Sequence, residues 1–162
     1  RIDAGHLALS PGGRLAVVSA QRKGLPNSET GGITIRLADG TFRTLEEPAD
    51  IVARLLGETL SVCIHEDRGI VGATTPLGNL LTFWDLDSGR LVRSYELENA
   101  RGITLTQDRR HFVVSYGADA EPEALCLVRV DDLERLHGFD IIGTGITGSH
   151  VFSCNLPADL RH

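Results

Sequence analysis

Leu9-Ser-Pro-Gly-Gly-Arg-Leu15-Ala-Val17 is the first of three stretches of this sequence that align with one another without a gap. The other two are Ile64-His-Glu-Asp-Arg-Gly-Ile70-Val-Gly72 and Thr106-Gln-Asp-Arg-Arg-His-Phe112-Val-Val114. Each stretch reads as the end of one strand, a polar turn and a second, apolar strand. The equivalent residues Leu15, Ile70 and Phe112 are separated by 55 and then by 42 residues. A period of this size, built from short strands, is typical of the blades of a β-propeller.

The repeat predicts an all-β fold of about three four-stranded antiparallel blades, similar to WD-type blades, in a single domain. We expect the blades over residues 6–46, 59–97 and 101–143, and a closing strand over 149–156. A short helix is expected between the first two blades, within residues 47–58, because Pro48 suits a first helical turn and the apolar residues share one helical face. Those apolar residues are Ile51, Leu55 and Leu56.

The second blade carries the clearest internal signal. Its third strand ends on Phe83-Trp84-Asp85, and the turn Asp87-Ser-Gly-Arg90 follows almost at once. In WD-type blades an aromatic residue at this place packs between neighbouring sheets. We therefore expect Trp84 in the core rather than on a ligand platform.

A closed propeller needs four to eight blades, so three are too few. The sequence begins at Arg1 without an initiator Met, which suggests a piece of something longer. We expect the remaining blades of the same propeller, in a missing N-terminal part, or another copy of this chain, to complete the ring.

Composition narrows the classes of partner. The chain has 162 residues and a formal net charge of −6, and its basic residues form no stripe, so nucleic acid is not expected as a partner. No apolar run approaches the roughly 18 residues that a membrane span requires. Cys63, Cys126 and Cys154 lie in apolar contexts and predict buried free thiols, with one disulfide and a spare thiol as the alternative.

Several stretches together resemble a bacterial family known as domain of unknown function 1513. They are Asp3-Ala-Gly-His-Leu-Ala-Leu-Ser10, Leu55-Leu-Gly-Glu-Thr-Leu-Ser-Val62, Ala73-Thr-Thr-Pro-Leu-Gly-Asn79, Thr82-Phe-Trp-Asp-Leu-Asp-Ser-Gly-Arg90, Arg101-Gly-Ile103 and Gly148-Ser-His150. The resemblance covers nearly the whole chain and matches the C-terminal half of the family. It implies a propeller-type protein exported to the periplasm and linked to iron acquisition, of undetermined activity. The family tends to end on Trp-Asp-Asn-His, whereas this chain reads Ser153-Cys-Asn-Leu-Pro157 there. The family's histidine is missing from this stretch, so its ligand role is not carried over to this chain.

The propeller prediction also sorts the polar residues by face. Residues at the start of each innermost strand surround the entrance of the central channel, and this rule selects His6, Thr59, Arg101 and His150. The connections from second to third strands lie on the same face and add the rim candidates Arg22, Lys23, Asn79 and Asp119. The opposite face should hold His65, Asp67, Asp108 and His111.

Two histidines and one arginine at a channel mouth suit an anion, or a metal bound through imidazole. The competing interpretation is that each histidine hydrogen-bonds a backbone group between blades. No His-x-x-x-His or Cys-x-x-Cys spacing occurs, so metal and cofactor remain unspecified. Gly143-Thr-Gly-Ile-Thr-Gly148 matches a dinucleotide fingerprint, but strand-like residues follow it instead of a helix, and we interpret it as a crossing to the closing strand.

These observations favour a non-enzymatic binding or scaffold propeller of undetermined ligand. The alternative is a cofactor- or metal-dependent propeller enzyme, similar to quinoproteins, that uses the same channel mouth. A third interpretation is a protein–protein platform in which the channel is inert.

Overall fold

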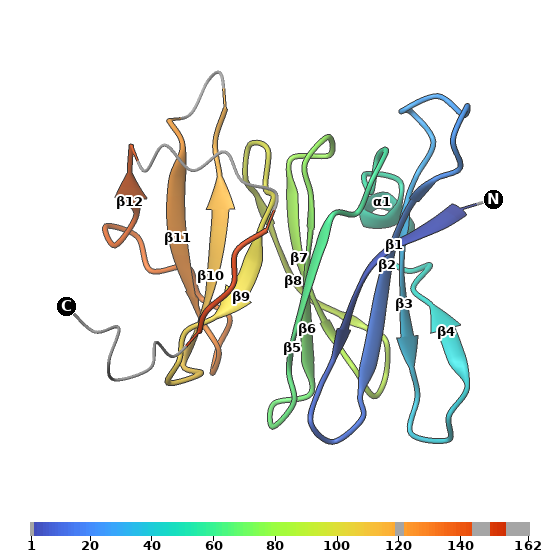
Figure 1. Ribbon diagram of the computed structural model, residues 1–162, viewed down its shortest axis with the longest axis horizontal. Helices are drawn as coiled ribbons and strands as arrows, with labels where there is room; N and C mark the ends of the chain where they lie inside the picture. The colour runs from blue at the N-terminus through green and yellow to red at the C-terminus, as the bar shows by residue number, and fades with distance from the viewer. Residues whose placement is uncertain (1, 119–121, 144–149, 155–162) are drawn as a thin grey trace.

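The computed structural model describes residues 2–118, 122–143 and 150–154 and shows three four-stranded antiparallel sheets (Figure 1). The first sheet contains β1 (Ile2–Leu9), β2 (Leu15–Gln21), β3 (Gly32–Arg36) and β4 (Phe42–Thr44). The second contains β5 (Ser61–His65), β6 (Ile70–Thr75), β7 (Leu80–Asp85) and β8 (Leu91–Glu96). The third contains β9 (Ile103–Leu105), β10 (His111–Tyr116), β11 (Ala124–Arg129) and β12 (Ile141–Ile142). In each sheet the strands lie in sequence order, as they do in propeller blades.

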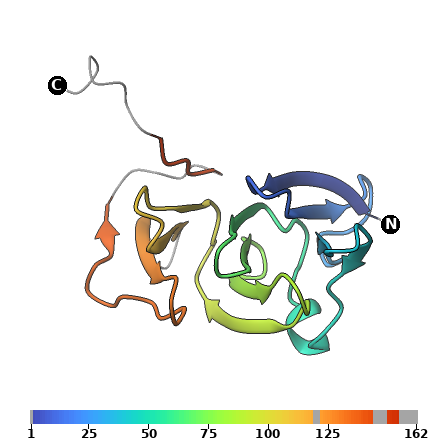
Figure 2. The ribbon, with the colours of Figure 1, turned by 90° about the horizontal axis from the view of Figure 1, so that it is seen from below.

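The three sheets stand side by side, and each is turned relative to the next (Figure 2). The first strands of the sheets are neighbours, because β1 contacts β5 and β5 contacts β9. They are the inner strands, and β4, β8 and β12 are the outer ones. The tight turns that follow β1, β5 and β9 lie at one end of the sheets, and the loops that lead into β5 and β9 lie at the other (Figure 1).

Two adjacent residues of β7 hold the three sheets together. Trp84 is fully buried and joins a core cluster with Val18 and Ile35 of the first sheet. Phe83 points to the other face, where its ring centroid lies 5.0 Å from that of Phe112 on β10. Alternation along a strand therefore gives each neighbouring sheet one large aromatic residue, and each such burial contributes roughly 1.5–3 kcal/mol. The prediction that Trp84 belongs to the core is confirmed.

The first strand begins earlier than expected, at Ile2, where the sequence suggested His6. The register between β1 and β2 shifts between Ala4 and His6, so the strand passes Gly5 as a bulge and pairs on to Gln21.

The connection between the first two sheets is a shorter helix than expected. Helix α1 covers only Ala49–Val52, directly after Pro48. Leu55 is fully buried in the first core cluster, but Leu56 forms an isolated bridge with Thr30 and so leaves the predicted helical face.

The last described residues, 150–154, form no strand. The rest of the expected closing strand, residues 149 and 155–156, lies outside the described residues, as do residues 144–148 of the glycine-rich crossing. No helix in the described part of the chain is long and apolar enough to cross a membrane.

Candidate functional site

His6 lies on β1, near the end of the inner strands where loops lead into β5 and β9, and its side chain is exposed. Its Nδ1 donates a hydrogen bond of 2.7 Å to the carbonyl oxygen of Leu60, just before β5. A carbonyl can only accept, so Nδ1 carries the proton and Nε2 remains to take up a second one. This hydrogen bond joins the first blade to the second through a backbone group, as the competing interpretation describes. It occupies only one of the two ring nitrogens.

His150 packs directly on His6. The two ring centroids are 4.3 Å apart and the ring planes meet at 64°. The two histidines are separated by nearly the whole chain, and the fold brings their rings into contact. Burial is the largest cause that lowers the pKa of His150, and the nearby His6 and Arg101 lower it further, while Glu58 opposes them.

Arg101 and Glu58 lie near His150, because the charges of both act on its pKa. Both line a cavity of about 390 Å³ together with Leu60. Arg101 stands just before β9 and donates a hydrogen bond of 3.4 Å to Oδ1 of Asn99. Glu58 was missed at the sequence level, although its position immediately before the selected Thr59 is the signal that would have found it. We call His6, Glu58, Arg101 and His150 the axial mouth.

The other sequence-predicted residues do not join the axial mouth. Thr59 is fully buried and accepts a 3.5 Å hydrogen bond from the hydroxyl of Thr75, so its side chain does not reach the surface there. Arg22 and Lys23 are exposed in the β2–β3 connection. Asn79 accepts a 2.9 Å hydrogen bond from the backbone nitrogen of Asn99 and is thereby engaged in holding a loop. The rim candidate Asp119 lies outside the described residues.

A second cavity, of about 270 Å³, extends from the axial mouth along the inner strands. Its walls come from β1, β5, β9 and residues 150–152, and they include both histidines and Cys63. Within the described ranges no group of three or more His, Cys, Asp or Glu side chains is placed to hold a metal ion. Two imidazoles, one guanidinium and one carboxylate are therefore the chemistry that the mouth offers.

Comparison with known proteins identifies the family. Residues 2–137 match DUF1513, a family described as "Protein of unknown function". The chain belongs to this family. A comparison with curated protein sequences finds no match.

Solved structures place this DUF1513 chain among the propellers. It resembles Sqt1 of Saccharomyces cerevisiae, a WD40 protein, with a TM-score of 0.60 and 10% identity. The match covers 88% of this chain and 35% of Sqt1, so the DUF1513 chain spans about a third of that protein's length. Regucalcin from Agrobacterium tumefaciens, described as a calcium-binding protein, matches with a TM-score of 0.48 and 15% identity, covering 82% of this chain and 43% of regucalcin. The three sheets of the DUF1513 chain are β-propeller blades.

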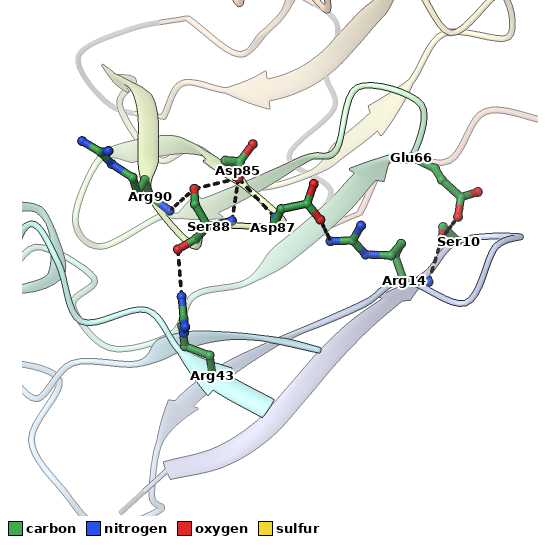
Figure 3. A network of polar contacts seen from close by, with 8 residues as sticks. All are labelled: Ser10, Arg14, Arg43, Glu66, Asp85, Asp87, Ser88 and Arg90. Atoms are coloured by element: carbon green, nitrogen blue, oxygen red, sulfur yellow. Dashed lines mark hydrogen bonds and ion pairs between the residues drawn. The ribbon is translucent and has the colours of Figure 1, made fainter. Parts of the chain in front are cut away.

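The opposite end of the DUF1513 sheets carries a polar network that joins the first two blades (Figure 3). Ser10 donates a 2.7 Å hydrogen bond to Glu66, and Arg14 forms an ion pair of 2.8 Å with Asp87. Asp85, next to Trp84, accepts hydrogen bonds from the hydroxyl and backbone nitrogen of Ser88, both 2.7 Å long, which lower its pKa. These contacts close turns and join blades, so we interpret this end as structural.

His65, predicted for this opposite face, shows the same structural role. The ring is buried, its Nε2 donates to the carbonyl of Arg109 at 3.1 Å, and its Nδ1 accepts from the backbone nitrogen of Arg68 at 3.2 Å. Both ring nitrogens are therefore occupied. Asp108, also predicted there, accepts hydrogen bonds from Thr106 and Arg110 that close the β9–β10 turn.

The three cysteines of this DUF1513 chain are free thiols. Burial raises the pKa of Cys63 and of Cys126 to about 12, which keeps both protonated and unreactive. Cys154, in contrast, is exposed, so the prediction of a buried thiol is wrong at this position. It lies in residues 150–154, which form no strand and so do not enclose their side chains between sheets.

Proposed function

We propose that this protein is a non-enzymatic binding propeller that takes a small anion, a phosphate or a carboxylate, at the axial mouth. The observation that supports the proposal is that His6 and His150, far apart in the sequence, line the 270 Å³ cavity with their rings in contact. Arg101, which lines the 390 Å³ cavity, lies close enough to lower the pKa of His150. The two cavities, of about 390 and 270 Å³, match a small molecule in size.

The hydrogen-bond inventory of the mouth makes anion binding depend on protons. Because Nδ1 of His6 donates to Leu60, only a proton on Nε2 gives this ring a second donor. The pKa of His150 lies below its usual value, so this imidazole is neutral at neutral pH. An anion bound beside His150 would raise the pKa of this ring, so binding should take up a proton and strengthen as the pH falls below about 6.5.

Glu58 sets the selectivity of the mouth, because its carboxylate raises the pKa of His150 and offsets part of the positive charge. Removing this charge should favour an anion. Glu58→Gln is therefore expected to bind an anion more tightly, whereas His150→Ala is expected to bind it more weakly.

The test is titration calorimetry of inorganic phosphate and of citrate into the protein at pH 6.0 and 7.5, in buffers free of other small carboxylates and phosphates. We compare the wild type with Glu58→Gln and His150→Ala, and use His137→Ala as the matched control because His137 is exposed and lines neither cavity. Binding that is tighter at pH 6.0, tightened by Glu58→Gln and lost in His150→Ala, is the expected result. Absence of binding by both anions, or equal binding by wild type and His150→Ala, would overturn the proposal. A visible absorbance band from a bound chromophore in the purified protein would favour the quinoprotein-like enzyme instead.

We propose further blades of the same ring as the partner of these three. The support is apolar exposure on both end sheets, where Leu7, Leu9 and Phe42 of the first sheet and Ile141 and Ile142 of the third are at least 60% exposed. The one-third coverage of Sqt1 also fits an incomplete ring. Light scattering tests this: association with a polypeptide that carries the other blades is expected, and a homodimer of this chain or a stable monomer would contradict it.

The family resemblance supports a further proposal on location and biological context. We propose that the protein acts in the periplasm, in iron acquisition. Fractionation of cells grown with and without an iron chelator is the measurement. The protein should be found in the periplasmic fraction and increase under iron limitation, and a cytoplasmic protein with constant abundance would refute this.

A further inference from the structure

Residues 150–154 lie across the inner strands without pairing to them as a strand (Figure 1, red segment beside β9). Three contacts hold this segment, which we call the strap. His150 packs on the ring of His6, Val151 packs on Gly102, and the side-chain amide of Gln107 donates a hydrogen bond to the carbonyl of Cys154. The first contact is between two titratable rings, and it sits at the axial mouth.

Gly102 determines how closely the strap approaches. A Cβ atom at this position would lie 2.7 Å from Cγ2 of Val151 and 2.8 Å from its backbone nitrogen. Both separations are well inside van der Waals contact, and one of them involves backbone, which cannot rotate away. Only glycine at position 102 therefore allows Val151 to pack at its observed position.

The strap covers two cavities. His150, Val151 and Phe152 border the 270 Å³ cavity against β1, β5 and β9. Ser153 and Cys154 border another, of about 290 Å³, towards the opposite end of the inner strands. The side chain of Phe152 is itself 84% exposed, so little apolar burial holds the strap in place. Loss of the contact between the histidines would therefore remove one of the three contacts named above and weaken the hold on the strap.

We propose that residues 150–154 form a pH-sensitive strap, which packs on the inner strands while His150 is neutral and is released when His150 is protonated. The inference uses the histidine pair of the axial mouth but does not require an anion to bind there. A bound anion would pair with protonated His150 and oppose release, so release is expected in the absence of an anion. It assigns a regulatory role to a segment that the proposed function uses only as one wall of the site.

The charged groups around His150 set the direction of the response. His6 on β1 and Arg101 before β9 both disfavour its protonation, as does burial, and only Glu58 before β5 favours it. Cys63 of β5 also faces the cavity but stays uncharged, because burial raises its pKa to about 12. The pKa of His150 is thus lower with the strap seated than with the strap released, so the released form binds more protons. Seating is complete above the usual pKa of 6.5 and weakens as the pH falls below it. Each unit by which the two pKa values differ changes the seating constant about tenfold.

The strap carries its own reporter position. Cys154 is exposed, whereas Cys63 is only partly exposed and Cys126 is buried, and the high pKa values of these two thiols protect them from reagents. A nitroxide label can therefore be attached to Cys154 alone, and its electron paramagnetic resonance spectrum distinguishes a seated from a freely moving strap. Gly102→Ala supplies the spectrum of the released strap, because the added Cβ occupies the place of Val151.

Spectra are recorded from pH 8.0 to 5.0 in buffers without phosphate or carboxylate, so that anion binding at the mouth does not contribute. The wild type should change from an immobile to a mobile spectrum with a midpoint below pH 6.5, and His150→Gln should show no transition over this range. His137→Gln, which alters an exposed histidine outside both cavities, should behave as the wild type. Far-ultraviolet circular dichroism checks that the blades stay folded throughout.

Two results would overturn the strap proposal. One is a wild-type spectrum that does not change with pH while Gly102→Ala is mobile. The other is an identical transition in His150→Gln, which would assign the change to another group. Failure of phosphate and citrate to bind would refute the proposed function and leave these spectra unaffected, so the two proposals fail separately.

Discussion

Replacing Gly72 with alanine should destabilise the contact between the second and third blades. Gly72 lies on β6, and a Cβ atom there would be 2.6 Å from Cδ1 of Ile103 on β9 and 2.9 Å from Cε1 of Phe83 on β7. Both distances require a neighbour to shift, and the core around them is fully packed, since Phe83 is 0% and Ile103 only 4% exposed. The added methyl group must therefore displace a side chain that fills the interface between two blades.

The cost follows from overpacking. An extra methyl group in a close-packed core typically destabilises by about 1–3 kcal/mol. For a chain of this size each kcal/mol lowers the melting temperature by roughly 2–4 °C, so Gly72→Ala should melt about 2–12 °C below the wild type. Differential scanning calorimetry and urea unfolding followed by Trp84 fluorescence measure the two quantities.

Gly5→Ala is the matched control, because its Cβ would meet only Oε1 of Glu58 at 3.4 Å and a backbone oxygen at 3.7 Å, which are ordinary contacts. It should change stability by less than about 1 kcal/mol. Combining Gly72→Ala with Ile103→Val, which deletes the clashing Cδ1, should cost less than the sum of the two single changes, with a coupling of about 0.5–3 kcal/mol. If Gly72→Ala proves as stable as Gly5→Ala, or if the double mutant is strictly additive, the interdigitation of β6 with β9 is refuted.

Three further changes test other parts of the fold. Burial, followed by its hydrogen bond to a carboxylate, raises the pKa of Tyr116 to about 12, so the folded state favours the neutral phenol. The free energy of unfolding should therefore be unaffected below about pH 10 and fall between pH 10 and 12. Unfolding curves at alkaline pH should show this loss in the wild type and not in Tyr116→Phe. Arg135→Met breaks the 2.6 Å ion pair with Asp140, whose side chains are only 16% and 17% exposed, and should lower the free energy of unfolding in urea by about 1–3 kcal/mol. Arg129→Met breaks the pair with Asp132, whose side chains are 41% and 46% exposed, and should lower it by less than about 1 kcal/mol. Equal effects of the two changes would contradict the role of burial. Treatment of the folded protein with N-ethylmaleimide should add one label, at Cys154, by mass spectrometry, and rapid labelling of a second thiol would contradict the assigned burial.

The blades were predictable because their determinants are local. Alternating apolar residues identify a strand and the face that it buries, and the polar turns of the aligned stretches separate the strands. Trp84 could be assigned to the core from its place before a turn. The helix within residues 47–58 was only partly predictable, because α1 ends after one turn and Leu56 then forms a bridge with the distant Thr30, which no local pattern reveals.

Residues at the axial mouth were harder to predict, because side-chain exposure there depends on how neighbouring blades meet. Thr59 and Glu58 are adjacent in the sequence, yet the threonine is fully buried and the carboxylate lines a cavity. Alternation predicts that one of the two points inward, but which one does so depends on how residues 58 and 59 bond to Ala20 and Ser19 of the first blade. The exposed Cys154 was missed for a similar reason, since an apolar stretch reads as a strand until the structure shows that it pairs with no other.

A comparison of His6 with His65 explains why ligand chemistry is assigned to one end of the blades and not to the other. Each imidazole donates a hydrogen bond to a backbone carbonyl of the next blade, so each helps to join two blades. His65 is buried and also accepts a hydrogen bond through its other nitrogen, which leaves neither ring nitrogen for a ligand. His6 is exposed, and the ring of His150 lies against it. Of these two rings, His6 alone lies beside a second imidazole and a cavity, and both the anion site and the strap follow from that difference.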